Sequence, residues 1–282
     1  ARTAARQRDS ERGRKPGREP AFAPNRERRP VTTRPEPLRL IPLHGLPEIV
    51  PGCDLAALIR DAARAQGVEL AGRVVVVCQK IVSKAEGRLV ELAGVTPSAL
   101  ALEIGAEHGR DPRQVEVVLR ESRRIVRRGR GVLITETHHG FVCANSGVDL
   151  SNAPGPDVAV LLPVDPDASA RRLSDALSTA AGPTPVVVSD TFGRPWREGL
   201  VDVALGSAGL APVRDDRGTM DRAGRELQVT QPATADQLAA AAGLLMWKSA
   251  GVPVVVVEGF PFEGDGTVRG ALLRDASTDL FR

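Results

Sequence analysis

Short apolar runs alternate with amphipathic stretches along most of the chain, and this pattern predicts a mixture of strands and helices. Nearly continuous valine runs, as at 73–78 and 185–189, are typical of strands that are buried on both faces of a sheet. Alternating or mostly apolar runs predict further strands and one hairpin. The predicted strands span 38–43, 73–78, 131–137, 140–144, 158–162, 185–189 and 252–257.

Helical periodicity fills most of the gaps between these strands. Asp54 precedes an amphipathic stretch, and Asp111 followed by Pro112 is typical of a helix start. Strands and helices do not alternate strictly, so the predicted fold class is α+β, or mixed α/β, with a helical insertion between 97 and 125. The predicted helices begin at 54 and span 97–108, 112–125, 168–180 and 233–247.

Charge is distributed unevenly between the first 36 residues and the rest of the chain. Residues 1–36 hold ten Arg and one Lys against five acidic residues, with a single aromatic side chain. A segment of this composition cannot bury enough apolar surface to offset the entropy lost on ordering. The sequence therefore predicts a disordered Arg- and Pro-rich tail over 1–36 and one folded domain over 37–282.

Composition also excludes or disfavours several classes of protein. The longest apolar runs are far shorter than the roughly 20 residues needed to cross a bilayer, so no transmembrane span is expected. The tail lacks the pattern of a secretory signal or a transit peptide, and the expected location is the cytoplasm. The four His residues match no metal-binding motif. Cys53, Cys78 and Cys143 lack the spacing of a zinc site or a disulfide framework and are expected to be reduced.

Two lysines follow one of the buried strands directly. Lys80 and Lys84 come after the strand at 73–78, in a chain that has only four Lys against 34 Arg. A lysine at the carboxyl end of such a strand can meet a phosphate, because sheet crevices commonly bind ligands there. A solvated strand end is the alternative interpretation. No P-loop motif and no dinucleotide-binding glycine motif is present, so the standard nucleotide sites are unsupported.

Acidic and hydroxyl side chains follow two other predicted strands. Asp149 lies in the polar stretch 145–152, which would also suit a simple turn. Asp190 and Thr191 come directly after the strand at 185–189, where a capped turn is the alternative. Magnesium-type cations take one or two carboxylates together with phosphate oxygens. Two acidic segments and one lysine-bearing segment therefore favour phosphoryl transfer.

In this order, the segments resemble the coenzyme F420-0:L-glutamate ligase family, the γ-glutamyl ligases that extend the deazaflavin coenzyme F420. The resemblance covers about residues 38–282. It rests on ordered motifs at 42–47 (PLHGLP), 80–88 (KIVSKAEGR), 147–152 (GVDLSN), 161–167 (LLPVDPD), 189–199 (SDTFGRPWREG) and 224–227 (GREL).

The resemblance implies a GTP- and metal-dependent ligase with an intertwined homodimeric fold. GTP would phosphorylate the carboxylate of the acceptor F420-0, and the amine of L-glutamate would attack the acyl phosphate. The implied cofactors are GTP as a substrate, Mg²⁺ or Mn²⁺, and K⁺ as a further cation. The motif match assigns Leu46, Pro47, Glu48, Ile49, Gln79, Lys84 and Asn152 to the nucleotide, Asp149, Asp190 and Thr191 to divalent cations, and Lys84, Asp149 and Asp190 to catalysis.

Gln79 departs from the family pattern, because relatives commonly have Ser at this position, and it leaves the nucleotide contact there open. Other functions also stay open. A related ligase could join an amino acid to a different acid, and a metal-dependent phosphohydrolase could use Asp149 and Asp190. The basic tail could bind nucleic acid, although its acidic residues favour a solubilising extension instead. No membrane partner is expected.

Overall fold

The computed structural model describes residues 36–129 and 131–280 of the chain. These residues form seven α-helices and three β-sheets, which confirms the predicted mixed α/β class. Residues 1–35, on which the predicted disordered tail falls, lie outside the described part, so the tail stays a prediction. The elements are β1 (Arg39–Pro42), α1 (Leu55–Ala65), β2 (Val74–Cys78), α2 (Gln79–Ala85), β3 (Leu89–Glu91), η1 (Leu92–Gly94), α3 (Ala99–His108), α4 (Pro112–Arg120), β4 (Ser122–Gly129), β5 (Val132–Thr137), β6 (Val142–Ala144), η2 (Asn145–Gly147), β7 (Val158–Val160), α5 (Pro166–Leu177), β8 (Val186–Arg194), β9 (Arg197–Ala208), α6 (Thr234–Gly243), β10 (Val254–Glu258) and α7 (Val268–Ala271).

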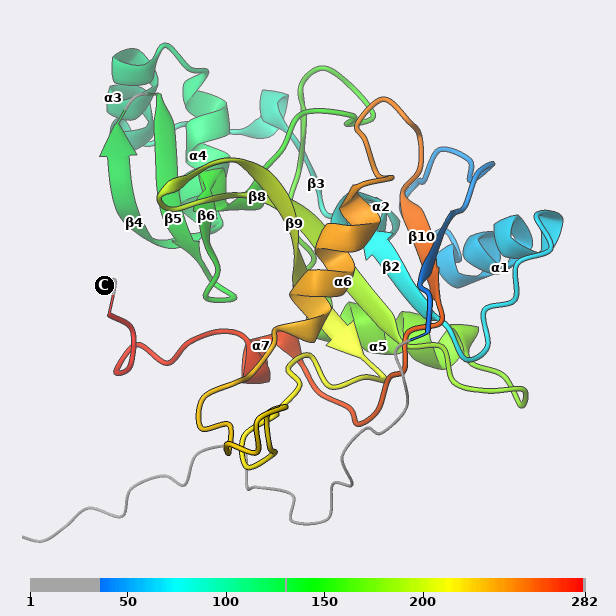
Figure 1. Ribbon diagram of the computed structural model, residues 1–282. Coiled ribbons are helices and arrows are strands. Elements are labelled where there is room, and N and C mark those ends of the chain that lie inside the picture. Colours follow the sequence, from blue (N-terminus) through cyan, green and yellow to red (C-terminus); the bar gives the residue numbers. More distant parts are fainter. Residues whose placement is uncertain (1–35, 130, 281–282) are drawn as a thin grey trace, which may run out of the picture. The chain divides into compact units, whose positions relative to one another are not determined.

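A mixed five-stranded sheet carries the fold, with the strand order β1-β10-β2-β8-β9 (Figure 1). The valine runs of β2, β8 and β10 are buried, as predicted for strands with both faces covered. β2 and β8 are parallel, with Cys78 opposite Ser189, and the other neighbouring pairs are antiparallel. The order and direction of these strands determine which of the connecting segments lie together at the carboxyl ends of β2 and β8.

Helices cover both faces of the sheet (Figure 1). α1 and α5 pack on one face, where Ile59 and Leu173 join alternate valines of the strands. α6 packs on the other face through Leu238 and its neighbours. Successive side chains of a strand point to opposite faces, so each central strand contributes to both cores. Gly206 in β9 is required by the close approach of α5, because a Cβ atom there would lie 2.1 Å from the Pro166 carbonyl oxygen.

A second lobe is built from the residues between α2 and α5. It holds α3 and α4, the three-stranded sheet β4-β5-β6 and the small sheet β3-β7 around its own apolar core. α4 begins as the sequence predicts, with Asp111 as its N-cap and Pro112 in the first turn, whereas α3 begins two residues later than predicted, after its N-cap Ser98. The predicted helical insertion is therefore confirmed, although it also contains strands.

Several predicted boundaries are wrong. The helix predicted over 112–125 ends at Arg120, because the residues from Ser122 onward form β4 and pair with β5. No helix was predicted for the residues after β2, which form α2. The strand predicted to end at 189 continues as β8 to Arg194 and turns at Trp196 into β9, which was not predicted. The helix predicted to reach 247 ends at Gly243.

Candidate functional site

Four segments of the chain reach the same edge of the central sheet. β2 and β8 are parallel, so their carboxyl ends lie side by side, and α2 and Asp190 follow directly. β10 is antiparallel to β2 and to β1, so its beginning and the end of β1 lie at this edge too. The loop after β1 and the loop before β10 therefore join the same site.

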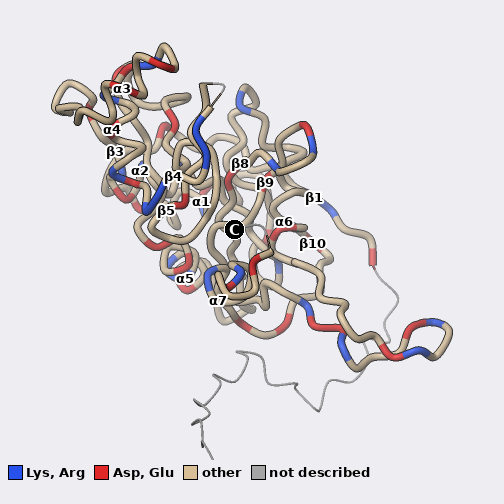
Figure 2. The backbone as a smooth tube through the Cα atoms, turned by 90° about the vertical axis from the view of Figure 1, so that its left-hand side faces the viewer, with Lys and Arg blue, Asp and Glu red and all other residues tan. Residues whose placement is uncertain are grey.

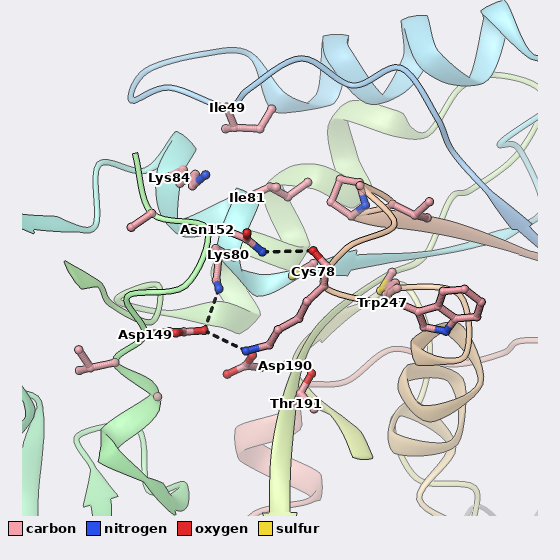
Figure 3. A pocket seen from close by; sticks show the side chains of 18 of the residues that line it. Ile49, Cys78, Lys80, Ile81, Lys84, Asp149, Asn152, Asp190, Thr191 and Trp247 are labelled. Atoms are coloured by element: carbon pink, nitrogen blue, oxygen red, sulfur yellow. Dashed lines mark hydrogen bonds and ion pairs between the residues drawn. The ribbon is translucent and has the colours of Figure 1, made fainter. Parts of the chain in front are cut away.

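A cavity of about 920 Å³ opens at this edge. Every residue that the sequence assigned to the nucleotide, to cations or to catalysis lines it, except Gln79. Figure 3 shows Lys80 and Asp149 facing each other, with Asp190 and Thr191 below them and Lys84 and Ile49 above. The strand pairing and the second lobe thus bring together residues that are up to 145 positions apart, from Leu46 to Thr191.

Lys80 anchors the acidic segment of the second lobe. Its ammonium group donates to Asp149 Oδ2 at 2.8 Å, to the Ser151 carbonyl at 2.7 Å and to Ser151 Oγ at 3.1 Å. Partial burial works to raise the pKa of Asp149, but hydrogen bonds from Lys80 and Ser151 outweigh it and hold the pKa below its ordinary value. Asp149 is therefore an ionised carboxylate beside a cation.

The backbone of the second lobe fixes where Asp149 lies. Asp149 exchanges two backbone hydrogen bonds with Val160 in β7, at 3.0 and 2.8 Å. Gly147 precedes it at a φ of +69°, and a Cβ atom there would lie 2.7 Å from a methyl carbon of Leu162. Only glycine fits this close approach without strain. The polar stretch is thus both a turn and a wall of the cavity.

Asp190 stands in a different electrostatic environment. Its pKa is raised to about 7, mainly by burial; the carboxylates of Asp149 and Asp202 add to the rise, and the Thr191 backbone N–H and Lys80 oppose it. Thr191 Oγ1 donates to Asp202 Oδ1 at 2.6 Å. Burial also raises the pKa of Asp202. Carboxylates that gather in this way gain from a positive charge placed between them.

Lys84 lies on the other side of the cavity, one turn along α2 from Lys80. It is buried and forms an ion pair with Glu48, so two residues that the sequence assigned to the nucleotide contact each other. Gln79 is buried behind this wall, where its amide donates to Ser83 Oγ at 2.5 Å and to the Leu161 carbonyl at 3.0 Å. Gln79 thus supports α2 from within.

Sequence reasoning missed several residues of this wall. Lys248, which lies beyond the end of the predicted helix 233–247, has its ammonium nitrogen 3.3 Å from Ser151 Oγ and 3.8 Å from Asp149 Oδ2. Trp247 lines the cavity beside it and is largely exposed. Cys78 and Cys143 also line the cavity, and burial raises their pKa values to about 11 and about 12. The scarcity of Lys was the one signal that pointed to Lys248.

The four histidines take no part in the arrangement. His138 and His139 lie in the turn after β5, where their rings hydrogen-bond to the carbonyls of Arg120 and Pro163 at 2.9 and 2.8 Å. Among the described residues, no three His, Cys, Asp or Glu side chains converge as a ready metal site.

The arrangement fits an anion together with a hard cation. Two carboxylates and a hydroxyl offer oxygen ligands, and three lysines from two walls offer positive charge to phosphate oxygens. Magnesium-type ions commonly use one or two carboxylates and complete their shell with water and substrate phosphates. The cavity at the edge of the mixed sheet is thus chemically suited to a phosphate-bearing ligand together with a hard cation.

Comparisons with known proteins show the family of this chain. The profile of the family described as "F420-0:Gamma-glutamyl ligase" matches residues 45–259. The chain is 45% identical over 251 residues to the "Coenzyme F420:L-glutamate ligase" of Methanothermobacter thermautotrophicus, covering 87% of this chain and 99% of that protein. The protein of the same name from Methanopyrus kandleri is 44% identical over 252 residues, with 87% and 98% covered. The one from Methanocaldococcus jannaschii is 40% identical over 215 residues, with 75% and 85% covered.

The chain belongs to the F420-0:gamma-glutamyl ligase family. The resemblance seen in the sequence motifs is thereby confirmed. Within the described residues, no helix combines the length and the apolar character that crossing a membrane would demand.

Proposed function

We propose that this protein is a ligase that adds L-glutamate to F420-0 with GTP as the phosphoryl donor. The observation that carries the proposal is the cavity at the sheet edge, which Lys84, Asp149 and Asp190 all line in a chain of this family. The names of the relatives support the acceptor and the amino acid. GTP comes from the resemblance in the motifs, and the lysines support it because they suit a polyphosphate.

The nucleotide subsite is proposed to lie between the 46–49 loop and α2. Lys84 would exchange its partner Glu48 for phosphate oxygens when the nucleotide binds, since a buried ammonium needs an anionic partner. Asn152 lies across the cavity from this loop and would contact the nucleotide. Gln79 would act through the position of α2, because its amide is already engaged inside the protein.

Asp149, Asp190 and Thr191 are proposed to hold the divalent cation. Their oxygen donors suit Mg²⁺ or Mn²⁺, and the raised pKa of Asp190 beside other carboxylates supports the proposal that a cation binds there. When bound, such a cation supplies charge neutralisation at the phosphate oxygens. K⁺ remains a further proposed cation, to be tested as a separate addition.

The reaction is proposed to run in two steps that the cavity holds together. The γ-phosphoryl group of GTP passes to a carboxylate oxygen of F420-0, which gives an acyl phosphate and GDP. The amine nitrogen of glutamate then attacks the acyl carbon, loses a proton and displaces phosphate. Lys84 would stabilise charge on the phosphate oxygens, and holding the reactants together can contribute roughly 7 to 11 kcal/mol.

The homodimer with an intertwined fold is a further part of the proposal. The exposed apolar side chains Met220 and Val229, on the loop between β9 and α6, are of the kind that protein contacts bury. The cytoplasm is the proposed location, since the three free thiols suit a reducing compartment. Sedimentation of the purified protein at several concentrations tests the dimer, and a single monomeric species would contradict it.

Two other functions, nucleic-acid binding and phosphate hydrolysis, lead to different expected results. The basic residues along β4 in Figure 2 give little support to nucleic-acid binding, because two of them already form ion pairs. Arg124 is paired with Glu136, and Arg128 is paired with two acidic residues of α3. Deletion of residues 1–35 tests the tail separately: glutamylation should persist and RNA retention should not change. A phosphohydrolase would release phosphate from GTP without acceptor or glutamate, which the component omissions below would reveal.

Mass spectrometry of the acceptor tests the proposal directly. The purified protein is incubated with F420-0, L-glutamate, GTP and Mg²⁺ or Mn²⁺, beside reactions that lack one component each. The acceptor should gain the mass of glutamate only in the complete mixture. Glutamate transfer to other carboxylic acids and not to F420-0 would move the assignment to a related ligase with a different acceptor.

A further inference from the structure

Lysine is rare in this chain, and the described lysines all line one cavity. The chain has four Lys against 34 Arg, and Lys80, Lys84 and Lys248 belong to the cavity wall, whereas none of its lining residues is an arginine. An ammonium group is a compact point charge on a flexible stem, while a guanidinium group is a broad planar fork. A site that brings several positive charges to one small anion favours lysine.

The side chains of the three lysines differ in their exposure and in the contacts that they make. Lys80 makes three hydrogen bonds of 3.1 Å or less, and its side chain is 14% exposed. Lys84 is buried against Glu48. Lys248 is 70% exposed, and its two contacts with the opposite wall, to Ser151 and Asp149, are 3.3 and 3.8 Å long. Lys248 is therefore the least constrained of the three lysines.

Lys248 also shares its carboxylate partner with a stronger competitor. Asp149 Oδ2 already accepts from Lys80 at 2.8 Å, so the more distant ammonium of Lys248 adds little there. A cation that binds Asp149 would repel Lys248, since two positive charges would then meet on one side of the carboxylate. The same cation brings phosphate oxygens into the cavity, where Lys248 finds a new partner.

We propose that Lys248 contacts the terminal phosphate of the nucleotide, leaving Asp149 when a divalent cation binds there. This rests on the proposed function and adds a residue that makes the site sensitive to the third phosphate. The loop after α6 carries Lys248, and the partner change draws this loop toward the phosphates. Lys80 keeps its contact with Asp149, and Lys84 exchanges Glu48 for phosphate oxygens with either nucleotide, so neither lysine distinguishes a diphosphate from a triphosphate.

The test compares Lys248→Met with the wild-type protein in two binding measurements. The first is the affinity for GDP and for a GTP analogue with a β,γ-imido bridge, both with Mg²⁺, by calorimetry. A charge-assisted hydrogen bond to the third phosphate predicts a loss of about tenfold or more for the analogue, with GDP changed by less than about twofold. Lys248→Arg should restore part of the loss because it keeps the charge.

The second measurement is Mn²⁺ binding to the nucleotide-free protein, by electron paramagnetic resonance. Here the expected effect has the opposite sign: Lys248→Met should bind Mn²⁺ a few-fold more tightly, because a competing positive charge near Asp149 is gone. Arg214→Met is the matched control, since Arg214 is likewise ion-paired with an aspartate, Asp216, but lies outside the cavity. It should change neither affinity.

The outcomes separate this inference from the proposed function. Equal losses for GDP and the analogue, or an unchanged affinity for Mn²⁺, would overturn the role of Lys248 even if the wild-type protein glutamylates F420-0. If the wild-type protein binds no guanine nucleotide and forms no product in the complete mixture, the proposed function fails and this role fails with it.

Discussion

Replacing Asp190 by Asn should separate stability from activity. Burial raises the pKa of Asp190 to about 7, so the folded protein resists ionisation of this carboxyl. An acid whose pKa is raised on folding does not destabilise the folded state below its ordinary pKa near 3.8, because it is then protonated in both states. The free energy of unfolding falls as the pH rises from there toward 7. In EDTA at pH 8, the neutral amide of Asp190→Asn should therefore make the protein more stable while glutamylation is lost.

The magnitude follows from the difference between the two pKa values. About three pH units correspond to about 4 kcal/mol, which is a ceiling because the side chain keeps some contact with solvent. A stabilisation of about 2 kcal/mol is the working expectation, and it raises the melting temperature by roughly 4 to 8 °C for a domain of this size. At pH 5.5 about half of this gain should remain, since the carboxyl is then largely protonated in the folded state.

Thermal denaturation in EDTA at pH 5.5 and pH 8 measures both values. Asp61→Asn is the control, because Asp61 is an exposed carboxylate paired with Arg64 and should change stability by less than about 0.5 kcal/mol. A loss of stability at both pH values would refute the argument from burial. Glutamylation that persists in Asp190→Asn at saturating Mg²⁺ would refute its assignment as a cation ligand.

Three further predictions concern the walls of the cavity. Gly147→Ala should cost about 2 to 3 kcal/mol in urea denaturation, against about 1 kcal/mol for Gly218→Ala, which has a similar φ but open space; equal losses would contradict the steric argument. Lys80→Met should lower stability by about 1 to 3 kcal/mol and reduce kcat/KM, and an unchanged melting temperature would contradict its anchoring role. Cys78 and Cys143 should resist iodoacetamide at pH 8 in the folded protein and react in denaturant, as peptide mass spectrometry would show, because burial raises their pKa values to about 11 and about 12.

Much of the site could be predicted because strand ends are visible in the sequence. The valine runs mark β2 and the first half of β8, and the polar residues that follow these runs, Lys84 and Asp190, are then placed at a sheet edge. The motif resemblance assigned Asp149 to the same site. What the sequence does not contain is the antiparallel pairing of β10 with β2, which brings in the loop that carries Lys248.

The errors have physical causes as well. The sequence around Arg123 and Arg124 keeps helical spacing of charges, but pairing with β5 and the buried Glu136 favour a strand there. The hairpin of β8 and β9 was missed because its outer half is exposed and polar, so it lacks the apolar run that identifies a buried strand. Tertiary pairing overrode local pattern in both places.

The same electrostatic reasoning connects Asp190 and Lys248. Lys80 works to lower the pKa of Asp190 but is hydrogen-bonded to Asp149, and the pKa of Asp190 stays raised by burial and by its carboxylate neighbours. The ammonium nitrogen of Lys248 lies 3.8 Å from Asp149 Oδ2, which is close enough for electrostatic attraction but too far for a hydrogen bond. A bound divalent cation would stabilise the ionised form of Asp190 and would at the same time displace Lys248 from Asp149. Cation binding and phosphate binding should therefore be coupled. Bound Mn²⁺ should raise the affinity for the GTP analogue by the same factor by which the bound analogue raises the affinity for Mn²⁺. This factor should be smaller in Lys248→Met.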